Sequence, residues 1–156
     1  PVAVVSDTLR RVSLLSESAT VRVAGWESHV SPRKFDVRAE LVASIPLTGM
    51  RPNRGKAENA ARFRRRIVLF ERGGNVPLSH KVRQAMEEGA LAVVIFDNTG
   101  RCDNDKFNQA CVPGSDISND DGFAALDPIA AWKGLDRIPT LLISRASGES
   151  LLAKLG

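Results

Sequence analysis

Apolar residues alternate with polar ones in the first third of the chain, and continuous apolar runs and helical stripes follow after residue 66. Alternation between residues 37 and 45 is typical of a strand with one buried face. Shorter apolar runs at residues 2–5, 12–15 and 20–24 predict three further strands. The first third is therefore expected to be rich in β-structure.

A strand, a helix and a second strand are predicted between residues 67 and 96. Ile67 to Phe70 is a continuous apolar run, as in a strand buried on both faces, and Gly73 and Gly74 end it with residues that accept positive φ. One helical stripe follows, with Gly89 placed to end the helix. Its members are Leu78, Val82, Ala85 and Met86. Leu91 to Phe96 is the next buried strand, so the unit predicts a right-handed parallel crossover.

A long irregular region, residues 97–137, separates this unit from a last buried strand at Ile138 to Ser144. A closing helix is then expected to bury one face, made of Gly148, Leu151, Leu152 and Leu155. Between residues 97 and 127 the chain has seven Asp against only Arg101 and Lys106. An irregular region of this length is typical of functional or partly self-structured loops.

Length and composition fit one soluble globular domain over residues 1–156, with 43% hydrophobic and 26% charged residues. The longest apolar run, Ala90 to Phe96, is far below the ~20 residues of a membrane helix. Residues 1–66 hold 13 Lys or Arg against 6 Asp or Glu, and residues 67–156 hold 9 against 12. Nucleic-acid binding is disfavoured because aromatic platforms do not alternate with the charges, so the basic run Arg62 to Arg66 is interpreted as a solvated turn.

Cys102 and Cys111 are the only cysteines, and the residues between them are polar. This spacing predicts a disulfide that closes a small loop and stabilises it by roughly 2 to 3 kcal/mol, which would place the chain in a secretory or extracellular setting. Two free thiols in a cytosolic loop are the alternative. Zinc is not expected, because neither His29 nor His80 has metal-ligand spacing from the cysteines.

Catalytic patterns are not found. Ser79 and His80 are adjacent on the predicted helix, so their side chains diverge and cannot share a proton. The glycine pair lacks the spacing of a phosphate-binding loop and is interpreted as a turn. Residues 116–127 resemble the start of a calcium loop, and a calcium-binding regulatory domain is therefore an alternative function. Two positions depart from that loop: the glycine is one place late, and Asp127 stands where a Glu is expected.

Four separated elements together resemble the protease-associated (PA) domain family. They are Ile67 to Gly74 with its Arg-Gly turn, a Lys81-containing helix ending in Gly89-Ala90, the strand Val93 to Asn98, and the Ile138-Pro139 strand that leads into a helix. The similarity covers residues 37–156, and residues 1–36 are expected to add N-terminal strands. The family commonly has a Cys after Arg-Gly-x, whereas this chain has Asn75 at that place, so the Cys102–Cys111 loop is its own elaboration.

The resemblance implies a mixed α/β fold: a two-layered β-sandwich or open barrel with helices packed on one side. It also implies a non-catalytic domain without a cofactor, which binds a protein or peptide within a larger secretory-pathway protein on the lumenal or extracellular side. The alternative is an accessory lid that controls access to the active site of a peptidase or glycosidase. Other domains of the same chain are then partners too.

In sorting receptors of this family the Arg of the Arg-Gly turn helps to hold the cargo peptide, and that role would fall on Arg72. The alternative is a surface arginine paired with Glu71 or Glu88. The predicted partner-binding residues belong to this turn and to the acidic loop. They are Arg72, Gly73, Gly74, Asn75, Asp103, Asp105, Phe107 and Asp120.

Overall fold

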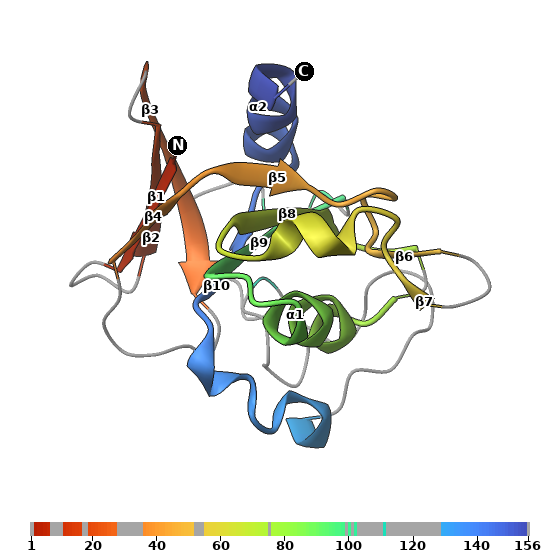
Figure 1. Ribbon diagram of the computed structural model, residues 1–156. Helices are drawn as coiled ribbons and strands as arrows, with labels where there is room; N and C mark the ends of the chain where they lie inside the picture. The colour runs from red at the N-terminus through yellow and green to blue at the C-terminus, as the bar shows by residue number, and fades with distance from the viewer. Residues whose placement is uncertain are drawn as a thin grey trace.

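The computed structural model describes residues 2–6, 11–16, 19–27, 36–51, 55–74, 76–98, 100, 102, 111 and 129–155. In these ranges two α-helices accompany the strands (Figure 1): α1 (Leu78–Glu87) and α2 (Arg145–Leu155). The strands are β1 (Val2–Ser6), β2 (Arg11–Ser16), β3 (Ala19–Glu27), β4 (Asp36–Ala39), β5 (Leu41–Ala43), β6 (Met50–Arg51), β7 (Gly55–Lys56), β8 (Ile67–Glu71), β9 (Ala92–Phe96) and β10 (Thr140–Ile143). Short 3₁₀ helices are η1 (Ala60–Phe63), η4 (Ile129–Trp132) and η5 (Leu135–Arg137).

Eight of the described strands form one sheet in the order β4-β1-β2-β3-β10-β9-β8-β5, and β6 pairs with β7 separately. The β4 to β10 part is antiparallel, whereas β10, β9, β8 and β5 are parallel to one another. The two edge strands, β4 and β5, are joined by the single residue Glu40. Because one residue spans only about 3.5 Å, the sheet must curl until its edges meet, which gives an open barrel.

This connection corrects the predicted strand over residues 37–45, which is two strands that pair with different neighbours. β4 pairs with β1, and β5 pairs with β8. The alternating pattern continues through Glu40 because its side chain is exposed between two half-buried neighbours. Periodicity alone therefore could not reveal the change of partner.

The predicted crossover β8-α1-β9 is confirmed, with β8 and β9 parallel. Helix α1 buries Leu78, Val82 and Ala85. Its end is fixed by Gly89, at φ 87°, and by Ala90, whose N–H donates to the Ala85 carbonyl at 2.9 Å. This is the pairing of a Schellman cap, which needs a residue at positive φ.

The two helices lie on opposite faces of the sheet, not on one side as predicted (Figure 1). Val68, Phe70 and Val93 share one apolar cluster with α1, whereas Ile67, Leu69 and Val94 share another with Leu151 of α2. Each strand therefore alternates between two cores, which explains its unbroken apolar run.

Three positions expected to be buried are exposed, and the first is Ile45, which follows β5 and is 51% exposed. Leu91 precedes the observed start of β9 and is 42% exposed, and Leu155, at the end of α2, is 43% exposed. Among the described residues, no helix combines the length and the apolar character needed to cross a membrane.

Candidate interaction site at the carboxyl ends of the parallel strands

The carboxyl ends of β5, β8, β9 and β10 meet at one edge of the sheet, because these strands are parallel and in register. Arg72, Gly73 and Gly74 follow β8, and Asp97 and Asn98 follow β9. In open α/β sheets this edge is where ligands commonly bind.

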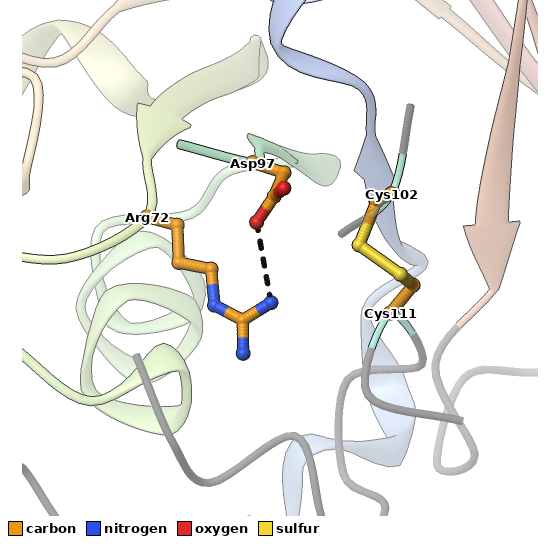
Figure 2. Close-up of a disulfide and its surroundings, with 4 residues drawn as sticks. All are labelled: Arg72, Asp97, Cys102 and Cys111. Atoms are coloured by element: carbon orange, nitrogen blue, oxygen red, sulfur yellow. Dashed lines mark hydrogen bonds and ion pairs between the residues drawn. A yellow bond between two sulfur atoms is a disulfide. The ribbon is translucent and has the colours of Figure 1, made fainter. Parts of the chain in front are cut away.

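Arg72 and Asp97 form a buried ion pair at this edge (Figure 2). Both side chains have 0% exposure, and the Arg72 Nη1 to Asp97 Oδ1 distance is 3.4 Å. The backbone holds the pair in place, since Arg72 N–H donates to the Phe96 carbonyl at 2.9 Å and Asp97 N–H to the Ile143 carbonyl at 2.8 Å. The alternative of a surface arginine paired with Glu71 or Glu88 is therefore wrong.

Lys81 fixes the turn after β8 from inside the protein. Its side chain is buried, and Nζ donates to the carbonyls of Thr48, Gly73 and Val76 at 2.8, 2.9 and 3.0 Å. Asn98 adds a bond from Nδ2 to the Arg72 carbonyl at 2.7 Å. The inner side of the turn is thus fixed by side chains from α1 and from the end of β9.

Both glycines of the turn have positive φ, 100° for Gly73 and 70° for Gly74, as predicted. Gly73 is buried and Gly74 is exposed. A Cβ at Gly74 would lie 2.6 Å from the Thr48 Cβ, so the turn also lacks space for a side chain there. Glycine is required at position 74 for both reasons.

The predicted disulfide between Cys102 and Cys111 is formed, with the two Cα atoms 5.8 Å apart. Both half-cystines are buried in the same apolar cluster as Trp132 and Leu135. Figure 2 places the bond near Arg72 and Asp97. The disulfide is therefore part of the core.

Five of the predicted contact residues lie outside the described residues, and their roles stay predictions. They are Asn75, Asp103, Asp105, Phe107 and Asp120. The calcium-like stretch, residues 116–127, also lies outside them. Gly73 and Gly74 are placed at the edge with Arg72.

Sequence reasoning gave Lys81 and Asp97 no part in the site. A signal for Lys81 was present, because position 81 falls on the apolar stripe of α1, three residues after Leu78, where a charged residue is unusual. Asp97 directly follows an apolar strand in a parallel sheet. The apolar surroundings of each residue indicate that it has a buried polar partner. The identity of that partner requires the three-dimensional structure.

The described residues include no group of three or more His, Cys, Asp or Glu side chains that could hold a metal ion. A hollow of about 320 Å³ lies between β7 and α1. Its cations are already engaged: Arg83 donates to the carbonyls of Ala131 and Lys133, and Lys56 is paired with Glu88 at 2.5 Å. The hydrogen bond to Glu88 raises the pKa of Lys56.

Comparison with known proteins identifies one matching family and several solved structures with the same fold. The PA domain model matches residues 37–151. No curated protein matches the chain. Solved structures with the same fold include an aminopeptidase from Aneurinibacillus sp. strain AM-1, with TM-score 0.56 and 22% identity over 99% of this chain. Another is BSAP, a zinc aminopeptidase from Bacillus subtilis, with TM-score 0.55 and 17% identity over 96% of this chain.

The chain spans 27% of the length of each aminopeptidase. At this identity the likeness is one of fold. The family match covers the crossover, the Arg-Gly turn and the Ile-Pro strand on which the resemblance was based. The chain therefore belongs to the PA domain family.

Proposed function

We propose that this chain is a non-catalytic PA domain that binds a protein or peptide segment at the carboxyl ends of β8 and β9. The observation that carries the proposal is the turn from Arg72 to Val76, which buried polar groups fix from beneath while Gly74 stays exposed. A turn held in this way loses little conformational entropy when a ligand binds, and this favours affinity.

Arg72 acts in this proposal by positioning the turn. Its guanidinium is buried against Asp97, and breaking that pair to reach a ligand would leave a buried charge without compensation. The contacts then come from the backbone of Gly73 and Gly74, from Asn75, and from the loop residues Asp103, Asp105, Phe107 and Asp120. The carboxylates of that loop suit a partner with basic side chains.

The host is proposed to be a larger extracellular or lumenal protein, with a peptidase as the preferred class. The disulfide and the family fit such a compartment. The solved aminopeptidases have this fold within chains nearly four times as long. An accessory lid that controls access to a peptidase cleft is the second candidate, and the same edge of the sheet would then face the catalytic domain.

Binding is tested with labelled chain on an array of random peptides. The parent chain should bind a subset of them, and Asn75→Trp should lower the signal on that subset by about fivefold or more, equivalent to about 1 kcal/mol. Asp136→Trp is the control, because Asp136 is exposed and precedes β10, at the opposite end of the sheet. Absence of binding, or equal binding by both variants and the parent, would contradict the peptide site.

The proposed lack of catalytic activity is tested in a separate experiment. The purified chain should leave chromogenic esters and aminoacyl anilides unhydrolysed above the rate in buffer. Turnover that increases with the concentration of the chain and survives repurification would overturn it.

A further inference from the structure

The opposite end of the sheet carries a concentrated positive charge. Arg62 lies in η1, and Arg64, Arg65 and Arg66 form the turn that leads into β8. Arg62, Arg64 and Arg65 are exposed, and Arg66 is partly exposed. These four residues, called the arginine turn below, lie at the amino ends of the parallel strands, and the candidate site lies at their carboxyl ends.

Within the described part of the chain, none of the four guanidinium groups of the arginine turn forms an ion pair with an acidic side chain. Among the residues that the structure describes, the one side-chain hydrogen bond of these four guanidinium groups is from Arg66 Nη1 to the Arg62 carbonyl, at 2.8 Å. Other exposed cations do have acidic partners, such as Lys56 with Glu88 and Arg145 with Glu149. Three exposed guanidinium groups and a partly exposed fourth, all within five consecutive residues, therefore repel one another, which favours an external anion.

Arg65 occupies a backbone conformation that usually selects glycine or asparagine. Its φ is 59°, and it is the only non-glycine residue at positive φ in the described ranges. Its N–H donates to the Gly89 carbonyl at 2.9 Å, so the turn is locked against the end of α1. An arginine is thus kept where glycine would be less strained, and such an exception to a local rule is typical of a functional position.

A structural explanation exists for two of the four arginines: Arg66 donates to the Arg62 carbonyl, and Arg64 lies beside the end of α1. Arg64 Cγ lies 3.4 Å from the position of a Cβ at Gly89, just beyond the end of α1. A cation is favoured near a helix C-terminus by the helix dipole. That effect falls off within one turn. It does not explain why the residue with positive backbone φ, Arg65, is an arginine.

An exposed apolar side chain accompanies the charges. Leu91 is 42% exposed, and its N–H donates to the Arg66 carbonyl at 3.0 Å, which fixes it beside the turn. Arginine forks bind carboxylates in a bidentate manner, and arginine is enriched at protein interfaces. Nucleic acid fits less well, since stacking aromatics do not alternate with these arginines in the sequence.

We propose that the arginine turn and Leu91 form a second interaction surface, which binds a carboxylate-rich protein segment with an apolar side chain at its centre. This surface is separate from the proposed site at the carboxyl ends. A host protein or a partner could therefore be held at both ends of the sheet.

The probe is a labelled peptide of glutamates around two central leucines, titrated with the chain at low salt and followed by fluorescence anisotropy. Arg62→Glu/Arg64→Glu should weaken binding by about tenfold or more, because two attractions become repulsions. Arg145→Glu/Lys154→Glu is the matched control with the same change in net charge, on exposed positions of α2. It should change the affinity by less than about twofold.

Two further variants separate binding from folding. Arg65→Gly removes a guanidinium and relieves the backbone, so affinity should fall while the thermal midpoint rises. Leu91→Ser should weaken binding of the leucine-containing peptide and leave binding of an all-glutamate peptide unchanged.

Three results would overturn the proposal: no binding of the peptide, equal weakening by the two double variants, or binding of a sulfated oligosaccharide or of anionic vesicles without binding of the peptide. Because none of these variants alters Asn75 or the acidic loop, failure here is distinguishable from failure of the site at the carboxyl ends.

Discussion

At the residue scale, the site depends on a buried charge pair and not on an exposed arginine. Replacing Arg72 by Met should destabilise the chain by about 3 to 5 kcal/mol, because Asp97 would remain buried without its cation. Arg72→Met/Asp97→Leu should recover most of this loss, since neither position then holds a buried charge. Urea unfolding of the two single variants and the double variant measures the coupling, and a double variant as unstable as the sum of the single ones would refute it.

Lys81 gives a second prediction at this scale. Lys81→Met should cost about 2 to 4 kcal/mol, because three backbone carbonyls lose a charged donor. The variant should lose stability locally as well as globally, so that the amides of residues 72–76 exchange faster than in the parent. Lys154→Met, at an exposed position on α2, should change the stability by less than about 0.5 kcal/mol. Equal exchange rates in the turn of the parent and Lys81→Met would contradict the positioning role.

At the element scale, α2 depends on a close contact between its glycine and β9. A Cβ on Gly148 would lie 2.2 Å from the Phe96 Cγ and 2.3 Å from its Cβ, too near the backbone for the ring to move aside. Gly148→Ala should therefore destabilise the chain by about 1 to 3 kcal/mol, although alanine favours helices. Ser150→Ala on the exposed face of α2 should be neutral or slightly stabilising. A Gly148→Ala variant at least as stable as the parent in urea would show that α2 does not pack this closely.

Elements with strong local periodicity were predictable from the sequence. The stripe of α1, the apolar runs of β8 and β9 and the Gly89 cap each depend on nearby residues, and the structure confirms them. The split between β4 and β5 and the opposite placement of the two helices were not predictable. Both depend on which strand pairs with which, and that pairing is non-local.

The site was predictable in part, for the same physical reason. Positive φ at Gly73 and Gly74 follows from residue type and position, and the disulfide follows from two cysteines at suitable spacing. The partner of Arg72 did not follow, because Asp97 is reached only through the parallel register of β8 and β9. A sequence marks which residues are unusual, whereas topology decides which of them meet.

At the scale of the whole molecule, the chain is a curled sheet with different chemistry at its two ends. Buried polar groups fix a glycine turn at the carboxyl ends of the parallel strands, and four arginines lie at the amino ends. The acidic segment begins on the carboxyl side, after β9. In this proposal, a host protein contacts the chain at two surfaces that differ in charge.

The proposed contact surface is tested by hydrogen exchange with mass spectrometry on the full-length host protein and on this chain alone. If the turn and the acidic loop are the contact surface, peptides covering residues 72–76 and 101–122 should exchange more slowly in the full-length protein, or after a bound peptide is added. Peptides from the exposed face of α2 should be unchanged. Identical exchange at residues 72–76 and 101–122 in every state, with protection elsewhere, would contradict the account.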